Sequence, residues 1–232
     1  MSTPTFRFNA AEFQDLAAQR LHPAVPQEME DMSIPAPRSD DDLNRHLGAT
    51  FDPVSSPRPA AVLVPLVMRE DGLTVLLTRR TDDMPSHPGQ VAFPGGKIDA
   101  GDDGPVGAAI RETQEETGLD RRFIETCGFL DIYQTRTGFR ICPVVALVRT
   151  GFSLEPEAGE VAEIFEVPLG FLMDPGNHQR HGREWEGKKR WFYAMPYDRH
   201  YIWGATAGMI RNFYDRVYAP GALHGTNLER ND

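Results

Sequence analysis

The sequence predicts an α/β protein in which a mixed β-sheet is covered by helices on both faces. Two observations support this fold class. Apolar runs rich in β-branched residues alternate along the chain with segments of helical periodicity, and such interleaving is typical of sheets with helices packed against them. A glycine-rich turn at residues 93–96 also leads toward a helical segment that Gly118 is placed to end, because glycine readily takes the positive φ found after a helix.

The composition is that of an ordinary soluble protein. The chain has 232 residues, of which 40% are hydrophobic and 25% charged, and this size suits one domain with an extension. The net charge of −10 argues against a general nucleic-acid or membrane-surface binder. The longest apolar stretch, at residues 59–68, is too short to span a bilayer, and no secretory leader pattern is evident. We therefore expect a cytoplasmic protein.

Residues 1–50 are expected to form an N-terminal helical extension with a linker, and residues 51–232 the main domain. Asn9 and Glu12 have the spacing of a capping box, which predicts that a short amphipathic helix begins there. A stretch containing prolines and acidic residues follows as the linker. A second short helix is predicted at residues 39–47.

The main domain is predicted to begin with a β-hairpin. Residues 61–68 and 73–80 are strand-forming runs, and the intervening Glu70-Asp71-Gly72 is a turn signal. A short strand into Phe93 is expected next. After the glycine turn, the pattern predicts a helix at residues 106–117.

Beyond this helix the pattern returns to strands. Strand-forming runs occur at residues 123–132, 139–148, 163–167, 191–195 and 201–203. The first two are expected to pair around the turn at residues 137–138. The last helix is predicted at residues 205–218, where Ile210, Phe213 and Val217 share one side.

Three carboxylates are expected on one face of the helix at residues 106–117. Glu112, Glu115 and Glu116 have the i, i+3, i+4 spacing that places side chains together. Crowded carboxylates repel unless a cation lies between them, and Mg²⁺ is usually held by a few carboxylates together with substrate phosphates. A solvated acidic face is the alternative, but the glycine-rich turn at residues 93–96 disfavours it.

Residues 96–119 resemble the Nudix box, the signature of hydrolases that cleave a nucleoside diphosphate linked to another moiety. Residues 111–119 match at every charged position, with Thr113 in place of an apolar residue. In the first half, the arginine arrives one residue late, and Asp102 or Asp103 replaces the loop glutamate. The resemblance implies the Nudix α/β/α sandwich with a mixed β-sheet.

Residues 76–96 are similar to an additional signature of coenzyme A pyrophosphatases, a subfamily of these hydrolases. Thr81 replaces the usual small residue of that signature, and Pro85 replaces an arginine. The second difference matters more, because an arginine can grip a phosphate whereas a proline side chain donates no hydrogen bond. Residues 202–207 also look like this subfamily.

The resemblance implies a site that depends on Mg²⁺ or Mn²⁺. The residues implied as metal ligands are Gly96, through its carbonyl, and Glu112, Glu115 and Glu116. Glu115 would complete the metal site or orient water. The base that takes the proton of the attacking water would be Glu112 or a glutamate from a later loop, for which Glu160 is the first choice and Glu163 the second. A charged strand rim is the alternative for these later residues.

Four residues upstream of the box are candidates for substrate binding. Arg79 and Arg80 could reach the substrate phosphates, or could form a solvated strand end. His87 could donate to a phosphate, or could make a local hydrogen bond. Gln90 is open to the same two interpretations.

The resulting hypothesis is metal-dependent hydrolysis of a pyrophosphate bond in a small nucleoside diphosphate derivative, with coenzyme A or an acyl derivative as the leading substrate. Two alternatives remain. A hydrolase of ADP-ribose or another nucleoside diphosphate sugar would keep the box without the additional signature. A catalytically silent module that senses nucleotides would keep the fold, although the three retained glutamates speak against it. No nucleic acid or membrane partner is expected, and the oligomeric state stays open, a homodimer included.

Overall fold

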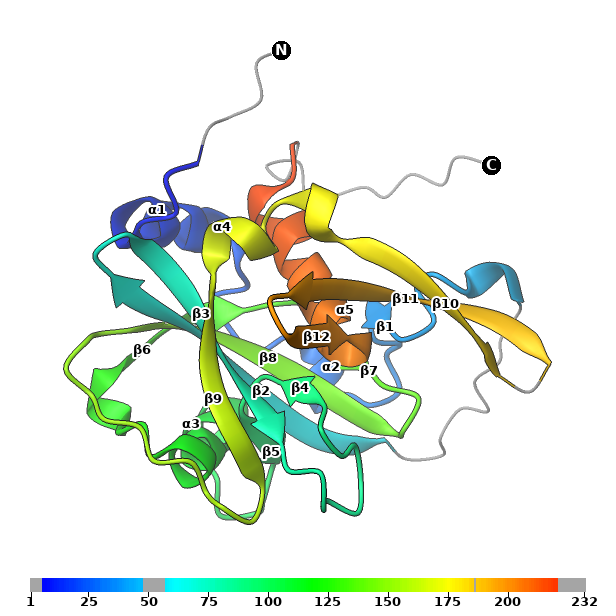
Figure 1. The fold of residues 1–232 in the computed structure, drawn as a ribbon, viewed down its shortest axis with the longest axis horizontal. Coiled ribbons are helices and arrows are strands. Elements are labelled where there is room, and N and C mark those ends of the chain that lie inside the picture. Colours follow the sequence, from blue (N-terminus) through cyan, green and yellow to red (C-terminus); the bar gives the residue numbers. More distant parts are fainter. Residues whose placement is uncertain (1–5, 48–56, 186, 221–232) are drawn as a thin grey trace.

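A large β-sheet forms the centre of the molecule (Figure 1). The structure is a computed structural model that describes residues 6–47, 57–185 and 187–220. The strands of the large sheet are β1 (Arg38–Ser39), β2 (Arg58–Arg69), β3 (Gly72–Arg80), β4 (Val91–Ala92), β5 (Gly95–Lys97), β6 (Ile124–Phe129), β7 (Tyr133–Gln134), β8 (Phe139–Val148) and β9 (Val161–Pro168). They are ordered β1-β7-β8-β2-β3-β4, while β5 pairs with β2, β6 with β8 and β9 with β3. The sheet is mixed, because β2 is parallel to β8 and antiparallel to β3.

A smaller antiparallel sheet and several helices complete the described fold. The smaller sheet contains β10 (Gln179–Trp185), β11 (Lys188–Tyr197) and β12 (His200–Trp203). The α-helices are α1 (Ala10–Arg20), α2 (Gln27–Glu30), α3 (Gly104–Thr117), α4 (Leu169–Leu172) and α5 (Gly204–Phe213), and α5 continues as a π-helical turn at Tyr214–Tyr218. Short 3₁₀ turns lie at Arg45–Leu47, Arg121–Phe123 and Pro175–Asn177. None of the helices within these described residues is long and apolar enough to cross a membrane.

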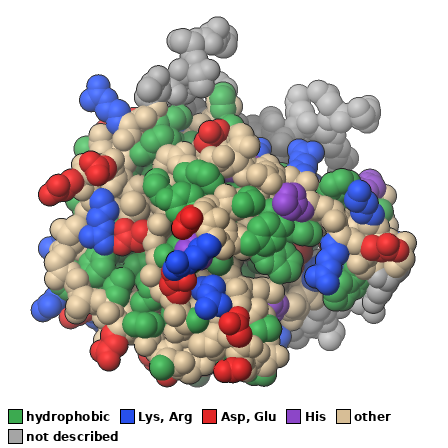
Figure 2. All heavy atoms as spheres, in the orientation of Figure 1, with side chains coloured by type: hydrophobic (Ala, Val, Ile, Leu, Met, Phe, Trp, Pro, Cys, Tyr) green, Lys and Arg blue, Asp and Glu red, His purple; other side chains and the backbone are tan. Residues whose placement is uncertain are grey.

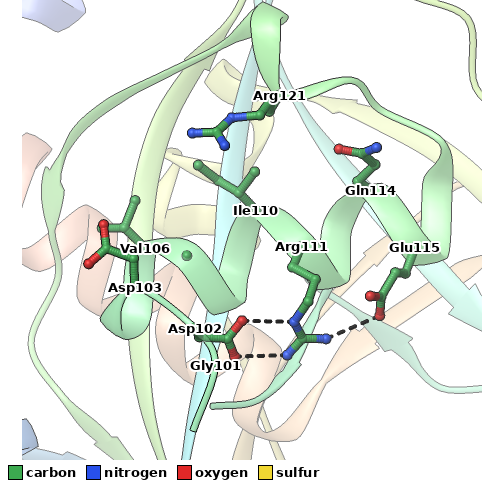
Figure 3. Close-up of a pocket in the computed structure, with 10 residues that line it drawn as sticks. Gly101, Asp102, Asp103, Val106, Ile110, Arg111, Gln114, Glu115 and Arg121 are labelled. Carbon is green, nitrogen blue, oxygen red and sulfur yellow. Dashed lines mark hydrogen bonds and ion pairs between the residues drawn. The ribbon is translucent and has the colours of Figure 1, made fainter. Parts of the chain in front are cut away.

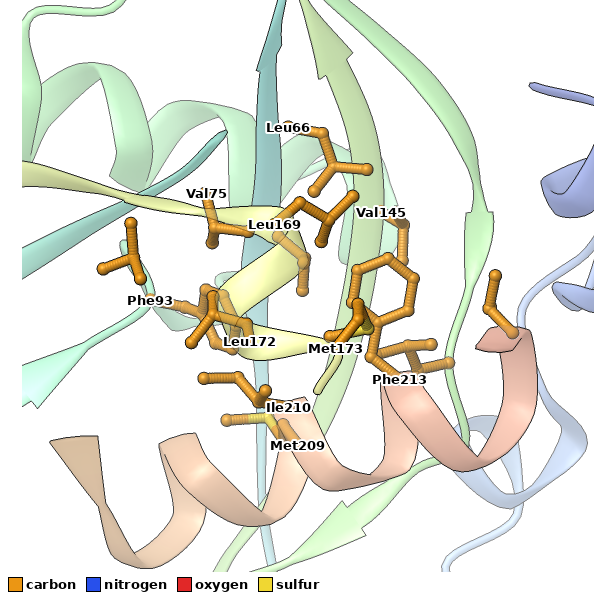
Figure 4. Packing of buried hydrophobic residues seen from close by; sticks show 14 of the residues in the cluster. Leu66, Val75, Phe93, Val145, Leu169, Leu172, Met173, Met209, Ile210 and Phe213 are labelled. Atoms are coloured by element: carbon orange, nitrogen blue, oxygen red, sulfur yellow. The ribbon is translucent and has the colours of Figure 1, made fainter. Parts of the chain in front are cut away.

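Strand β2 supplies side chains to two hydrophobic cores, one on each face of the large sheet. Ala61 and Leu63 are buried in the cluster that includes α3. Val64 and Leu66 are buried in a second cluster with α1, α4 and α5, where Phe213 of α5 points toward the sheet (Figure 4). Successive side chains of a strand point to opposite faces, so a strand that is apolar on both faces needs cover on both. The predicted α/β sandwich with a mixed sheet is confirmed.

The N-terminal helix is confirmed and packs against the main sheet. Asn9 caps α1, and its side-chain oxygen accepts a hydrogen bond from the backbone N–H of Glu12 at 2.9 Å. Phe13 of α1 is fully buried, and its ring meets Phe213 edge-on with 6.1 Å between centroids. The boundary predicted between residues 50 and 51 lies outside the described residues.

The prediction of a second short helix at residues 39–47 is wrong. Within this segment only the single 3₁₀ turn at Arg45–Leu47 is helical. The side chain of Asn44 instead bonds the backbone of β11, accepting from the N–H of Trp191 and donating to its carbonyl, both at 2.8 Å. These contacts with β11, a strand far away in the sequence, satisfy the polar groups of the Asn44 side chain and override a weak helical preference.

The segment expected to be a linker contains α2 and is fastened to the sheet. Met29 is buried against the α3 side, and the buried Arg140 of β8 donates to the carbonyl oxygens of Glu28 and Ile34, both at 3.0 Å. The β2–β3 hairpin, α3, β9, and the pairing of β6 and β7 with β8 agree with the strands and helix predicted from the sequence. Strand β10 was not predicted, because its mostly exposed residues carry no apolar alternation.

Candidate active site

Two glycines of β5 bring the backbone against the carboxylates of α3. The N–H of Gly95 donates to Oε2 of Glu116 at 3.2 Å. Gly95 has φ of 151°, and a Cβ on it would lie 2.4 Å from the carbonyl oxygen of Ala61 in β2. A Cβ on Gly96 would lie 2.4 Å from Cδ of Glu112. At Gly95 the backbone of β2 leaves no room for a side chain, and at Gly96 a side chain would displace the carboxylate of Glu112.

Glu112, Glu116 and Glu160 act on one another electrostatically. Glu116 is 7% exposed, and burial, aided by the charges of Glu112 and Glu160, raises its pKa to about 7, although the Gly95 N–H and Arg80 act in the opposite direction. Burial also raises the pKa of Glu112, and Glu160 contributes to that increase. The structure therefore places two of the three box glutamates, Glu112 and Glu116, near Glu160, whereas the carboxylate of Glu115 is 58% exposed and pairs with Arg111.

The position of Glu160 is set by the loop that precedes β9. The backbone N–H of Glu157 donates to the carbonyl of Glu116 at 3.0 Å, and the carbonyl of Glu160 accepts from the N–H of Thr81 at 2.9 Å. The loop is thus anchored to the end of α3 on one side and to the end of β3 on the other. Among the described residues, no hydrogen bond or ion pair engages the Glu160 carboxylate, so this group is available for chemistry.

Glu163, the second choice for the later glutamate, is already paired with cations. Its carboxylate forms ion pairs with Arg199 and, at 3.3 Å, with His200, and lies 4.0 Å from Nε of Arg79. Burial alone would raise the pKa of Glu163, but its contacts with Arg199 and His200 hold that pKa below its ordinary value. A carboxylate stabilised in its charged form is a poor acceptor of a proton.

Arg111 links the loop before α3 to two of the box glutamates. Its guanidinium grips Asp102 with two hydrogen bonds of 2.8 and 2.9 Å (Figure 3). The third nitrogen, Nη1, donates to Glu112 at 2.9 Å and to Glu115 at 3.1 Å. Arg111 holds the pKa of Asp102 at about 2. Of the two aspartates that could replace the loop glutamate, Asp102 thus makes the contact with the helix, whereas Asp103 is the residue preceding α3.

Of the four predicted substrate-binding residues, Arg80 lies near the carboxylates of α3, whereas the other three make contacts with residues close to them in the sequence. Arg80 lies close enough to Glu116 to lower its pKa, and its buried Nε has no hydrogen-bond partner within the described residues. Arg79 pairs with Asp82 at 3.1 Å. Nδ1 of His87 and Oε1 of Gln90 lie 3.1 Å apart, which is a local hydrogen bond within the loop before β4. Arg80 is therefore the cation of this set that faces the carboxylates.

An open groove of about 580 Å³ runs along the outer side of α3 (Figure 3). Asp102, Arg111 and Glu115 line it, but Glu112 and Glu116 do not. We place the candidate site next to this groove, at the Gly95–Gly96 turn, because Glu112 and Glu116, whose pKa values are raised, lie against that turn. Sequence reasoning missed the Gly95 N–H as a donor, although the glycine-rich turn was a signal for it.

Comparison with known proteins identifies the family. The NUDIX domain model matches residues 57–188, more than half of the chain. The chain belongs to the Nudix family. A protein of Enterobacter sp. (strain 638) named uncharacterized Nudix hydrolase NudL is 40% identical over 160 residues, which cover 66% of this chain and 80% of that protein. A protein of the same name from Photorhabdus laumondii is 34% identical and covers 79% and 90% of the two chains.

Solved structures of Nudix proteins show more distant similarity. The Nudix hydrolase RenU of M. smegmatis is 23% identical, with a TM-score of 0.43, over 51% of this chain and 75% of that one. By family membership the protein is a Nudix hydrolase, and its reaction class is cleavage of a pyrophosphate bond in a nucleoside diphosphate derivative.

Nudix hydrolases generally need a divalent metal such as Mg²⁺ or Mn²⁺, and the donor set at the Gly95–Gly96 turn suits such an ion. Carboxylate and carbonyl oxygens are the ligands of hard cations. Burial, together with the charges of neighbouring glutamates, raises the pKa of both Glu112 and Glu116, as expected where a positive charge belongs. Among the described residues, no three histidine, cysteine or acidic side chains are grouped closely enough to hold a metal ion, and Arg111 engages Glu112 and Glu115.

From this Nudix site we predict that the free energy of unfolding of the metal-free protein decreases as the pH rises from 5 to 8. The pKa of Glu116 is about 7 in the folded protein against an ordinary 4.5, so between these values the folded state holds a proton that the unfolded chain has lost. The free energy of unfolding then falls with rising pH. At about 1.4 kcal/mol for each tenfold change in proton affinity, the loss attributable to Glu116 is about 3 kcal/mol.

The test compares the unfolding of the native protein and Glu116→Gln in chelator at pH 5.5 and pH 8. The difference between the two proteins cancels the other titrating groups, and the variant should be the more stable at pH 8. Millimolar Mg²⁺ should then raise the melting temperature of the native protein by mass action. Equal pH dependence in the two proteins, with no response to Mg²⁺ or Mn²⁺, would contradict the prediction.

Proposed function

We propose that this protein uses Mg²⁺ or Mn²⁺ to hydrolyse the pyrophosphate bond of coenzyme A or an acyl-coenzyme A. The observation that carries the metal-dependent chemistry is the mutual effect of Glu112, Glu116 and Glu160 beside the Gly95–Gly96 turn. The similarity of residues 76–96 and 202–207 to the coenzyme A pyrophosphatase signature supports the substrate.

In this proposal the metal is held by Glu112, Glu116 and the Gly96 carbonyl, with Glu115 completing the set or orienting water. The bound ion would supply charge neutralisation at the pyrophosphate oxygens. Glu112 and Glu115 would exchange their contacts with Arg111 for the ion, and Arg111 would keep its two bonds to Asp102.

The proton and the phosphate are assigned to other side chains. Glu160 takes the proton of the attacking water, because its carboxylate has no cationic partner among the described residues, whereas Glu163 is paired with Arg199 and His200. Glu112 is the alternative base. Arg80 contacts a substrate phosphate through its guanidinium, whose Nε has no partner in the described structure. The products would be adenosine 3′,5′-bisphosphate and a phosphopantetheine.

Hydrolysis of ADP-ribose or a related nucleoside diphosphate sugar is the second candidate function. Pro85 favours it, since this exposed loop residue stands where the coenzyme A signature has an arginine. The deciding experiment incubates the purified protein with coenzyme A, acetyl-coenzyme A, ADP-ribose and a nucleoside diphosphate sugar, each with Mg²⁺ and with Mn²⁺, and identifies the products by mass spectrometry. Rapid cleavage of ADP-ribose with coenzyme A left intact would replace the first candidate by the second.

Pro85→Arg is expected to lower the KM for coenzyme A more than the KM for ADP-ribose. A charge-assisted hydrogen bond to phosphate contributes about 1.5–3 kcal/mol, or roughly a ten- to hundredfold change in affinity. Met68→Arg is a matched control, because it adds the same charge at a 37% exposed residue of β2. Met68 lies about 23 Å along the strand from Ala61, the residue of β2 that is next to Gly95. Equal changes in the two variants would show that only net charge matters.

A further inference from the structure

The two faces of the β10–β11–β12 sheet have different environments. On the inner face, Met195 and Ile202 are fully buried in the core that contains α5. Strand alternation places His181, Phe192, Tyr201 and Trp203 on the outer face. Tyr201 is 40% exposed and the other three are half-buried. Figure 2 shows hydrophobic side chains gathered over this part of the molecule, beside histidine and basic side chains.

The four rings form one connected surface, which we call the aromatic platform (His181, Phe192, Tyr201 and Trp203). Trp203 lies 6.3 Å from Tyr201 with 30° between the ring planes, and 5.3 Å from Phe192. Nδ1 of His181 and the hydroxyl of Tyr201 are hydrogen-bonded at 2.6 Å. The small, buried Ala194 lies opposite Trp203 on β11. The aligned Tyr201 and Trp203 rings offer a flat area to a planar ligand.

Basic residues share the outer face with the platform. By the register of the sheet, Arg183, Lys188 and Arg190 point to the same side as Phe192, and no described residue of these three strands places an acidic side chain there. Arg190 is already paired with Asp41 at 3.2 Å, whereas Arg183 and Lys188 are exposed. The whole chain has a net charge of −10, so a basic and aromatic face is unusual for it. The chemistry complements a ligand that combines a planar ring with negative charge.

The platform also lies close to the candidate site. Strand β12, which carries Tyr201 and Trp203, lies next to β4, and the hydroxyl of Thr206, just after β12, donates to the carbonyl of Val91 in β4 at 3.0 Å. Gly95 follows Ala92, the last residue of β4, by three residues, a span of at most about 11 Å. An extended ligand can therefore reach from the platform to the carboxylates.

We propose that the aromatic platform binds the purine base of the nucleotide half of the substrate, stacked on Tyr201 and Trp203, while Arg183, two residues along β10 from His181 on the same face, meets the phosphate on its ribose. This inference rests on the proposed function and adds a base-recognition site to it. The base would be fixed on one sheet while its pyrophosphate lies at the Gly95–Gly96 turn of the other.

The test measures equilibrium binding of adenosine 3′,5′-bisphosphate and of inorganic pyrophosphate by calorimetry, for the native protein and its variants. Tyr201→Ala and Trp203→Ala should weaken binding of the adenosine compound by about 5- to 100-fold, the usual effect of removing an aromatic stacking partner. Binding of pyrophosphate, which has no base, should be unchanged. In turnover assays the same variants should raise KM and leave kcat nearly constant.

Two further variants keep the test independent of folding defects. Tyr201→Phe retains the ring and loses only the hydroxyl bonded to His181, so it should bind nearly as well as the native protein. Trp185→Ala removes a tryptophan that is 55% exposed. Gln179 of β10 is level with Ala194 and Trp203, and Trp185 lies six residues farther along β10, about 20 Å from that level. It should have no effect.

Equal affinity for the adenosine compound in all variants would overturn the inference. So would a native dimer, detected by sedimentation, that Tyr201→Ala dissociates, since the platform would then be an interface between copies. If no substrate is hydrolysed but Tyr201→Ala still loses nucleotide binding, the proposed function fails and the base site stands. If hydrolysis persists and binding is unaffected, the base site alone fails.

Discussion

Glu112→Gln and Glu116→Gln are each expected to lower kcat by at least about 100-fold while the fold survives. Each substitution removes one negative charge from the oxygens expected to hold the metal, and loss of preorganised charge stabilisation typically costs factors of this size. Folding should be retained in Glu116→Gln, because the new side chain keeps a carbonyl oxygen that can accept the Gly95 N–H, and because burying a neutral amide there avoids the cost of burying a charge.

Steady-state hydrolysis at saturating Mg²⁺ measures this effect, with circular dichroism to verify folding. Glu125→Gln is the matched control, since it makes the same chemical change at an exposed residue of β6 and should leave kcat unaltered. Near-normal turnover by a folded Glu112→Gln, Glu116→Gln double variant would remove the catalytic assignment. The pH–rate profiles of Glu160→Gln and Glu163→Gln then identify the base, because only loss of the base should remove the acidic limb.

Gly95→Ala is expected to destabilise the protein by about 3 kcal/mol and to lower activity as well. The new Cβ would meet the backbone of β2 at 2.4 and 2.6 Å, at a φ of 151°, and neither the clash nor the unfavourable φ can be relieved by rotating a side chain. Any shift of β5 moves the Gly95 N–H away from Glu116. Chemical denaturation gives the loss of stability, and hydrolysis assays give the loss of activity.

Three other glycines serve as controls for this prediction. Gly101→Ala, with open space and no positive φ, should be neutral, and Gly104→Ala, with open space at φ of 62°, should show only the backbone cost. Gly96→Ala would instead meet the flexible carboxylate of Glu112 at 2.4 Å, so it should lose activity with a smaller loss of stability. If Gly95→Ala is as stable as Gly101→Ala, the packing argument for the glycine turn is wrong.

The sequence by itself determined those features whose causes are local. The Asn9 cap of α1 depends on a residue three positions away. The end of α3 depends on Gly118, whose φ of 71° lets its N–H bond the carbonyl of Gln114. The grouping of Glu112 and Glu116 on one helix follows from helical spacing alone. Such features involve neighbours within a turn or a hairpin, so a single sequence carries enough information to predict them.

Tertiary structure alone decided which distant groups meet. Strand β9 pairs with β3 through a register shift at Arg79 and Arg80, which sets Arg79 opposite Glu163 and Arg80 opposite Val161. That register leaves Glu163 paired with cations and Glu160 beside the carboxylates of α3. A shift of one residue would send each side chain of a strand to the other face. Because register between strands far apart in sequence depends on the packing of the whole sheet, no local pattern could show that Glu163 is paired with cations or predict the aromatic platform.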